Sequence, residues 1–219
     1  FRIVPFEEFI MFRPMFRTAL FATGLMISAL LFAACTTTHG AAVRSGKTVQ
    51  ALPSTTVSGV ALRHPRTGLV TAAQPDIGDW NELATDGIRT VINLRPQAEM
   101  QGRDERAEVT AAGMRYIELP IATAADITPE NAHRLAALLG EATGPVLVHC
   151  GSGNRVGGLL AVAMAQSGMR TEAALEFGRG AGMKSTEPRA REVIEQQRAA
   201  LCAADAGQVV DPTQCPQGG

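Results

Sequence analysis

Residues 145–160 read Pro-Val-Leu-Val-His-Cys-Gly-Ser-Gly-Asn-Arg-Val-Gly-Gly-Leu-Leu. The apolar run at 146–148 is too short for a helix and predicts a buried strand. The small and apolar residues from Val156 to Ala165 predict a helix. Between the two, small residues let the backbone curl so that successive N–H groups converge on one point, where the helix adds its N-terminal dipole. The segment therefore predicts an anion-binding loop at the end of a buried strand.

Cys150 lies at the mouth of this loop. The loop itself consists of Gly151, Ser152, Gly153, Asn154 and Arg155. Convergent N–H donors and the nearby guanidinium favour a thiolate, which makes Cys150 a candidate nucleophile. Arg155 is a candidate to bind two oxygens of an anion. His149 either supports the loop through hydrogen bonds to its backbone or tunes the thiolate directly. A buried strand-end cysteine beside an ordinary turn is the alternative, but it leaves the coincidence of strand, cysteine, glycines, arginine and helix unexplained.

Length and composition give broad limits. The 219 residues leave room for one domain of ordinary size after a leader. Hydrophobic residues make up 46% and charged residues 19% of the chain, which is typical of a globular α/β protein with an apolar leader. A formal net charge of −1 gives no reason to expect nucleic acid as a partner. The four cysteines form no C-x-x-C pair and the histidines are not at ligand spacing with them, so we expect no metal and no cofactor.

The N-terminal part predicts export. Arg13 and Arg17 precede an uncharged run at 18–34, as in a secretory leader. The residues before Cys35 resemble a bacterial lipobox, so residues 1–35 predict a lipoprotein leader and a periplasmic domain tethered to the membrane through Cys35. A cleaved, soluble exported form and an uncleaved anchor are the alternatives. Residues 36–59, rich in Thr, Ser, Ala and Gly, predict a flexible tether.

Residues 60–201 carry the alternating pattern of one α/β domain. Its expected strands cover residues 69–72, 90–94, 115–119 and 146–148. Its expected helices cover residues 77–85, 99–112, 129–139, 156–167, 171–180 and 187–201. The first helix is expected to bury Ile77, Trp80 and Leu83 on one face. The alternation predicts a mainly parallel sheet with helices on both faces and the Cys150 loop at the carboxyl end of a central strand.

The chain from roughly Gly68 to Lys184 resembles a known family. The resemblance rests on Ala73-Gln74-Pro75, the segments 89–96 and 116–121, the helix opening at 128–131, and the Cys150 loop. These resemble the phosphatase-like domain of beta-lactamase hydrolase-like proteins, a branch of the dual-specificity and tyrosine phosphatase superfamily. The resemblance implies a cysteine-phosphatase-like fold. The loop is also similar to the active loop of rhodaneses.

Loop length separates two chemistries. Four residues lie between Cys150 and Arg155, as in rhodanese-type sulfurtransferases, whereas tyrosine phosphatases have five. This spacing favours a sulfurtransferase that carries sulfane sulfur as a Cys150 persulfide. A phosphatase acting through a phosphocysteine is the second hypothesis, and the family resemblance then implies Asp126 as the acid that protonates the leaving group. The third is a non-catalytic module that binds an oxyanion. In each case the ligand is a small anionic sulfur or phosphate compound.

The last segment, 202–219, is expected to be a tail. Its Cys202 and Cys215 enclose twelve residues, and in an oxidising compartment they predict a disulfide that leaves Cys150 free. Among the other cations, Arg95, Arg179 and Lys184 are expected to be surface or structural charges.

Overall fold

The computed structural model describes residues 54–56 and 58–204, all of which belong to one compact unit of the chain. The leader, most of the tether and residues 205–219 of the tail lie outside the described residues, and with them Cys35 and Cys215. The predictions made for these segments therefore stay predictions. Within the described part, no helix has the length and apolar character needed to cross a membrane.

A five-stranded sheet forms the centre of the domain, in the order β1-β2-β5-β3-β4. The strands are β1 (Leu62–Arg66), β2 (Leu69–Ala72), β3 (Thr90–Asn93), β4 (Arg115–Glu118) and β5 (Val146–His149). Parallel pairing joins β2, β5, β3 and β4, and β1 pairs antiparallel with β2 at one edge. Every residue of β2, β3 and β5 is buried, because helices cover both faces. The predicted mainly parallel sheet, with β5 at its centre, is confirmed.

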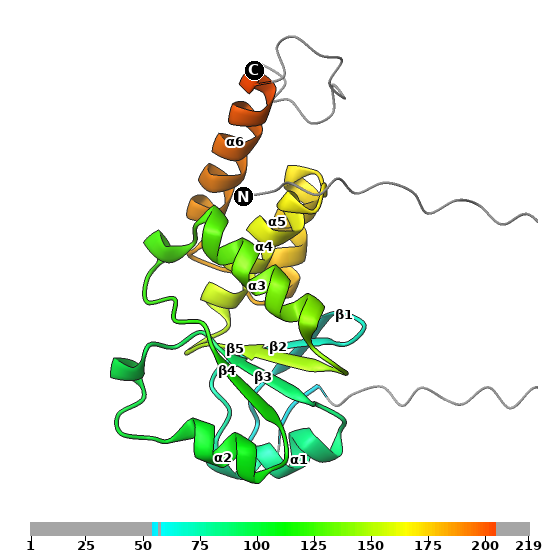
Figure 1. Cartoon of the computed structure of the whole chain (residues 1–219), viewed down its shortest axis with the longest axis vertical. Coiled ribbons are helices and arrows are strands. Elements are labelled where there is room, and N and C mark those ends of the chain that lie inside the picture. Colours follow the sequence, from blue (N-terminus) through cyan, green and yellow to red (C-terminus); the bar gives the residue numbers. More distant parts are fainter. Residues whose placement is uncertain (1–53, 57, 205–219) are drawn as a thin grey trace, which may run out of the picture. The chain divides into compact units, whose positions relative to one another are not determined.

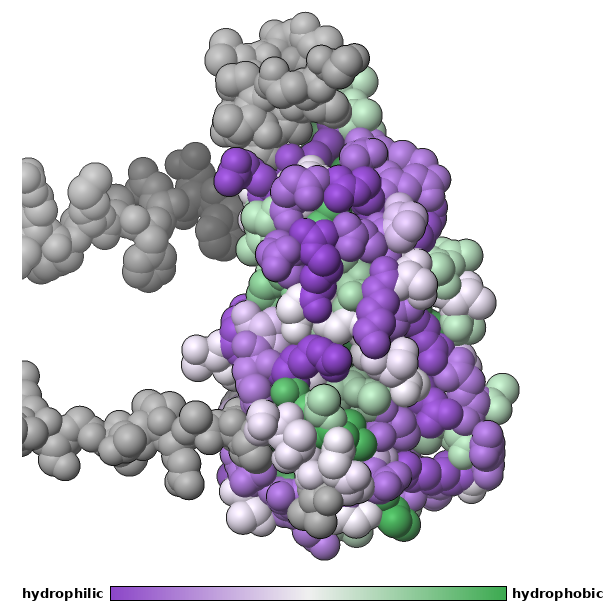
Figure 2. Space-filling view, turned by 180° about the vertical axis from the view of Figure 1, so that it is seen from behind, coloured by the Kyte–Doolittle hydropathy of each residue, from purple (hydrophilic) through white to green (hydrophobic). Residues whose placement is uncertain are grey.

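In the described part of the chain, six helices flank the sheet, and the last of them packs on the two before it. They are α1 (Trp80–Thr85), α2 (Glu105–Ala111), α3 (Pro129–Glu141), α4 (Asn154–Gln166), α5 (Thr171–Gly180) and α6 (Glu187–Ala204). Figure 1 shows α1 and α2 on one side of the sheet and α3 to α6 on the other. Each side has its own apolar core. Figure 2 shows the opposite face, where hydrophilic side chains dominate the helical upper half and apolar side chains gather in part of the lower half.

Edge strand β1 was not predicted. Its sequence, Leu-Arg-His-Pro-Arg, has no apolar run and contains Pro65, which cannot donate to a ladder. An edge strand tolerates such residues because one of its sides has no strand partner. The antiparallel pairing places Arg63 opposite Thr71 of β2.

Two local predictions were wrong. The helix expected over 99–112 begins only at Glu105, where the Asp104 carboxylate accepts the N–H of Ala107 at 3.0 Å and caps it. Ahead of it lie a 3₁₀ turn at Gln97–Glu99 and a reversal in which Gln101 has a φ of 53°. The charged residues of this segment recur at helical spacing, so the sequence showed no sign that the helix begins only at Glu105.

Ile77 does not share the buried face of Trp80 and Leu83. It is 69% exposed, whereas the other two side chains are buried. The reason is that Ile77–Asp79 form a 3₁₀ turn and α1 starts only at Trp80, so helical spacing does not apply across the boundary.

Close backbone packing fixes the start of α4. A Cβ placed on Gly157 would lie 2.2 Å from the backbone nitrogen of Met183, so the helix touches the turn that follows α5. A Cβ on Gly158 would lie 2.7 Å from side-chain atoms of both Ile127 and Thr186. Only glycine permits these approaches, and they hold the N-terminus of α4 in place behind the Cys150 loop.

Candidate active site

Cys150 directly follows β5 and is completely buried, with 0% of its surface exposed. Its Sγ accepts a hydrogen bond from the N–H of Gly153 at 3.1 Å. Gly153 is the N-cap of α4 and has a φ of 82°, a conformation that glycine adopts at little cost. Gly151 and Ser152 are exposed. The sulfur therefore lies at the base of the loop, beneath an exposed rim, and points toward the start of a helix.

Arg155 is held beside the sulfur by Glu99. Nη1 and Nη2 donate to the two carboxylate oxygens of Glu99, each at 2.7 Å, and Nη1 also donates to the carbonyl of Ile121 at 2.7 Å. A Cβ placed on Gly151 would lie 3.4 Å from Nη2, so the guanidinium stands against the loop. The hydrogen bonds to Glu99, together with the electrostatic interaction with Cys150, raise the pKa of Arg155 although its burial acts the other way. Arg155 is thus a positioned cation at the nucleophile.

Glu99 is a site residue that the sequence analysis missed. Its hydrogen bonds with Arg155 lower its pKa below the ordinary value, so it remains a carboxylate. The sequence pattern placed it only at the start of the helix expected over 99–112. A usable signal existed, because β3 and β5 are neighbouring parallel strands whose carboxyl ends meet at one edge. The segment that follows β3 therefore had to lie near Cys150.

Polar side chains continue from Glu99 to the residue before the nucleophile. Arg95 Nε donates to Glu99 Oε2 at 3.4 Å, and its Nη1 donates to Oε1 of Gln74 at 2.6 Å. Nε2 of Gln74 donates to Glu105 Oε2 at 2.6 Å, and the other oxygen of Glu105 lies 2.8 Å from Nε2 of His149.

We call this arrangement the polar chain. Its members in order are His149, Glu105, Gln74, Arg95, Glu99 and Arg155. It starts next to Cys150 in sequence and returns to Cys150 in space, so His149, the residue before the nucleophile, and Arg155, the cation beside the sulfur, are coupled through one set of hydrogen bonds.

The buried end of the polar chain is the pair His149 and Glu105, both almost inaccessible to solvent. Burial by itself raises the pKa of Glu105, but the hydrogen bonds from His149 and Gln74 and the charge of Arg103 outweigh it and lower the pKa overall. His149 makes no hydrogen bond to the loop backbone, because its Nε2 pairs with Glu105 and its buried Nδ1 has no partner. One of the two predicted roles, hydrogen bonding to the loop backbone, was therefore wrong. Direct tuning of the thiolate stays a prediction.

Asn154, predicted as part of the anion-binding loop, ties α4 to the segment 184–186. Its Oδ1 accepts the N–H groups of Lys184 at 2.7 Å and Thr186 at 3.2 Å, and its Nδ2 donates to the hydroxyl of Ser185 at 2.9 Å. Its side chain is thus a structural link of the loop.

Asp126 lies on a loop that touches Arg155. Its carboxylate accepts the N–H groups of Ala122 at 2.9 Å and Thr123 at 2.8 Å. The carbonyl of Ala122 in turn accepts from Nη1 of Arg155 at 3.2 Å. The structure therefore brings this loop to the site while its carboxylate caps a 3₁₀ turn, and the role of Asp126 as an acid stays a prediction.

The remaining predicted sites concern metals and disulfides. Within residues 54–56 and 58–204, no cluster of three or more His, Cys, Asp or Glu side chains is placed to hold a metal ion. Cys150 is a free thiol. Cys202 is disulfide-bonded. Cys215 lies outside the described residues, so the pairing of these two cysteines stays a prediction.

With this geometry in view, comparison with known proteins is informative. Residues 61–168 match the family model of the beta-lactamase hydrolase-like protein, phosphatase-like domain. This part of the chain resembles a phosphatase-like domain. It is 35% identical over 91 residues to a beta-lactamase hydrolase-like protein of Agrobacterium fabrum and 34% identical over 91 residues to one of Xylella fastidiosa. These matches cover 40% of the chain but only 21% of each relative, so the chain spans about a fifth of the length of the curated relatives it matches.

Solved structures agree with this assignment. A candidate phosphatase from Neisseria meningitidis Z2491 is 25% identical with a TM-score of 0.53, over 60% of this chain and 96% of that one. Tk-PTP in its active form is 21% identical with a TM-score of 0.51, over 62% and 97% of the two chains. PTPMT1 in complex with PI(5)P is 18% identical with a TM-score of 0.52, over 64% and 98%. The last two show the fold alone.

The phosphatase-like domain thus has the cysteine-phosphatase-like fold predicted from its sequence. The comparisons support the phosphatase hypothesis better than the sulfurtransferase hypothesis that loop length favoured. Sulfur transfer, which the four-residue spacing between Cys150 and Arg155 favours, stays a prediction.

Proposed function

We propose that this domain is a cysteine-dependent phosphatase that hydrolyses phosphate monoesters through a phosphocysteine at Cys150. One observation carries the proposal: the sulfur accepts the N–H of Gly153 at the start of α4, and Arg155 stands beside it in a phosphatase-like fold. Both groups attract a dianionic phosphate. The helix dipole acts in the same direction.

In the first step, the Cys150 thiolate attacks phosphorus, so an S–P bond forms while the bond from phosphorus to the ester oxygen breaks. Arg155 and the N–H groups of the loop hold the non-bridging oxygens, on which negative charge is spread in the transition state. The leaving oxygen takes a proton from Asp126. For this step the loop turns the carboxyl group of Asp126 away from the N–H groups of Ala122 and Thr123, to which it is bonded in the structure.

In the second step, water attacks the phosphorus of the phosphocysteine. Its proton passes to the Asp126 carboxylate, the S–P bond breaks, and inorganic phosphate leaves with the Cys150 thiolate restored. Glu99 takes no part in bond making. It orients Arg155, because its two oxygens accept one N–H from each terminal nitrogen. The other N–H of Nη1 faces the carbonyls of Ile121 and Ala122, so the second N–H of Nη2 is left for the substrate.

Mass spectrometry of the purified protein tests the chemistry directly. The protein is exposed to an aryl phosphate, quenched in acid, and compared with a sample exposed to thiosulfate. We expect one phosphoryl group on the peptide that contains Cys150 and no gain of sulfur. Cys150→Ser is the control that should show neither. A gain of one sulfur atom without any phosphoryl transfer would replace this proposal by the sulfurtransferase hypothesis, which the four-residue spacing still supports.

Steady-state kinetics test the acid. Asp126→Asn should lower kcat for phenyl phosphate by roughly 10²-fold or more and should matter much less for para-nitrophenyl phosphate, whose leaving group needs little protonation. Glu130→Gln is the matched control, because this carboxylate is exposed at the first turn of α3. An equal loss with both esters would remove Asp126 from the mechanism.

We further propose that the N-terminal segment exports the domain and anchors it through a lipid on Cys35. The support is the lipobox-like sequence before that residue. Full-length protein produced in a bacterium should incorporate a labelled fatty acid, and Cys35→Ala should not. Unlabelled wild-type protein that is nonetheless exported would favour the cleaved, soluble form instead.

A further inference from the structure

Two cations stand beside the Cys150 loop without a carboxylate partner. They are Arg63 on β1 and Lys184 in the segment between α5 and α6. Neither forms an ion pair with any side chain in residues 54–56 and 58–204, and neither donates a side-chain hydrogen bond there. Their charges are therefore available to a ligand.

Arg63 reaches the loop directly from the edge of the sheet. A Cβ placed on Gly153 would lie 3.6 Å from Nη1 of Arg63, and a Cβ on Gly182 would lie 3.5 Å from the same nitrogen. The guanidinium therefore stands between the loop and the turn after α5. Gly153 is also the residue whose N–H meets the sulfur of Cys150. Gly153 thus lies between the guanidinium of Arg63 and the sulfur of Cys150.

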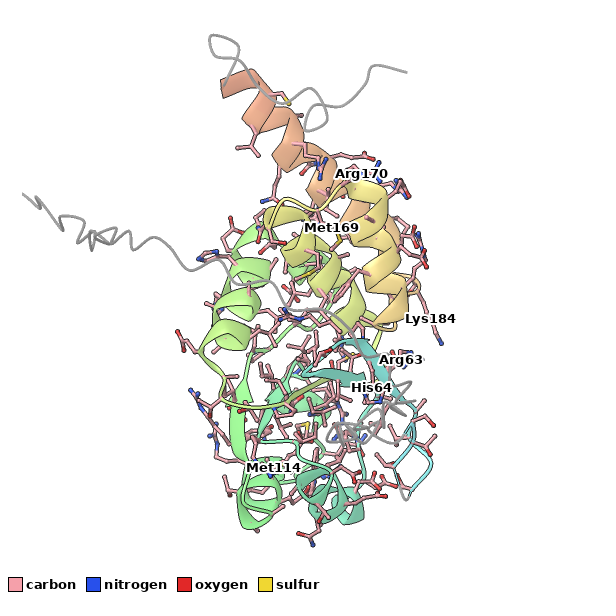
Figure 3. All side chains as sticks on the ribbon, turned by 90° about the vertical axis from the view of Figure 1, so that its right-hand side faces the viewer. Arg63, His64, Met114, Met169, Arg170 and Lys184 are labelled. Carbon is pink, nitrogen blue, oxygen red and sulfur yellow. The ribbon has the colours of Figure 1, made fainter. Side chains whose placement is uncertain are left out.

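Lys184 lies on the same side of the loop. Its backbone N–H donates to Oδ1 of Asn154 at 2.7 Å, which fixes the position from which the side chain starts. The side chain itself is exposed. Figure 3 shows Arg63 and Lys184 on one side of the molecule, at the level where the strands meet the helices. The guanidinium of Arg63 therefore lies against Gly153, and the backbone of Lys184 is bonded to Asn154, the next residue of the loop.

A single phosphate does not need these charges. The reacting phosphate is met by the N–H groups of the loop and by Arg155, whose position Glu99 fixes. Unpaired cations next to such a site are best used by a second anionic group, since each hydrogen bond to a charged group adds favourable free energy to binding. A neutral extension of the substrate would leave them hydrated and without effect.

Resting on the proposed phosphatase function, we propose that Arg63 and Lys184 form a second anion subsite. The preferred substrate is a phosphate monoester that carries another anionic group, a carboxylate or a second phosphate, close to the reacting phosphate. Arg63 binds this group from the sheet edge and Lys184 binds it from the turn after α5. The subsite sets substrate preference and takes no part in bond breaking.

Matched substrates test the subsite. The probes are meta-carboxyphenyl and para-carboxyphenyl phosphate, each measured against its neutral carboxamide analogue with the full-length protein. We expect the better carboxylate ester to exceed its carboxamide in kcat/KM by roughly tenfold, mainly through KM. Arg63→Gln and Lys184→Gln should each lower this ratio several-fold. Arg66→Gln should leave it unchanged, because Arg66 is an exposed cation of the same strand.

The outcomes separate two failures. No turnover of any ester by the wild-type protein would overturn the proposed function, and the subsite with it. Turnover of carboxylate and carboxamide esters at equal kcat/KM would overturn the subsite alone. If Arg63→Gln and Lys184→Gln each lowered kcat/KM equally for the carboxylate and the carboxamide esters, the subsite would also be overturned. Both side chains would then support the structure of the loop and would not bind the second anionic group. Lys184 is exposed, so its variant keeps the test valid even where Arg63→Gln fails to fold.

Discussion

The two flanks of the Cys150 loop differ in how their charges are used. On the flank of the polar chain, Arg155 and Arg95 both contact Glu99, and the chain ends in the buried pair of His149 and Glu105. On the flank of Gly153, the cations Arg63 and Lys184 have no carboxylate partner in the described part of the chain. Paired charges fix geometry, whereas unpaired charges can recognise a ligand. The comparison suggests that one flank positions the catalytic groups and the other selects the substrate.

The largest effect is expected where the paired flank is most buried. Glu105→Ala should lower the free energy of unfolding by about 3 to 5 kcal/mol, because His149 would keep a buried ring without its partner. Glu118→Gln is the matched control. That carboxylate pairs with Arg106 at the surface, so its loss should cost less than about 1 kcal/mol. Urea denaturation measures both, and equal small changes would mean that the buried pair does not hold this flank.

The next effect concerns activity. Glu99→Gln should lower kcat/KM for an aryl phosphate by roughly 10²-fold, since Arg155 loses the group that orients it, while the melting temperature should change little. Glu172→Gln, which breaks the exposed pair with Arg191, should leave both quantities unchanged. Wild-type activity in Glu99→Gln would show that the loop positions Arg155 without help from this flank.

A smaller effect on stability is expected when the hydrogen bonds between the loop and the segment 184–186 are removed. Asn154→Ala should lower the free energy of unfolding by about 2 kcal/mol, because it leaves two backbone N–H groups without their acceptor. It should also reduce the preference for carboxylate esters, since the segment that carries Lys184 would no longer be fixed. Asn81→Ala, on the exposed surface of α1, controls for the loss of an amide. An unchanged substrate preference would show that Lys184 does not depend on Asn154 for its position.

The smallest effect is expected from mild acid. The folded-state pKa values of Glu99 and Glu105 lie below their ordinary value of 4.5, so both carboxylates favour the folded state when ionised. Their contribution to stability is complete above that value and is lost as pH falls through the lowered values. Urea midpoints should therefore stay constant down to about pH 5 and fall below it. Glu99→Gln should make the decline shallower, and an identical decline in both proteins would contradict this assignment.

Periodicity and turn residues were enough to predict most of the fold. The bounds expected for β2 and α5 agree with the structure. The apolar run of β2 and the helical spacing of apolar residues in α5 both end at clear breaks in the sequence. Pro65 and the polar residues around it concealed β1. Residues 99–104 were assigned to a helix, since charges at helical spacing look the same on a helix and in a loop. Tertiary packing, which a local pattern does not contain, decides such cases.

The core of the candidate site could be predicted in part. Cys150 and Arg155 follow from a local motif, and the structure places their side chains together as expected. Glu99 and Glu105 could not be assigned locally, because their partners lie 56 and 44 residues away in the sequence. The sequence also could not show that Arg63 has no carboxylate partner among the residues that the structure describes, because the absence of an ion pair depends on tertiary structure.

The polar chain has a consequence for protein engineering. Its hydrogen bonds draw on the turn after β2, the segment after β3 and the start of α2 as well as on the loop. A six-residue graft of 150–155 into an unrelated scaffold would carry the thiol and the guanidinium but leave their supports behind. A transplantable unit must keep these supports together with β2, which pairs with β5, and with α4, which begins at the loop, so it takes in most of the domain.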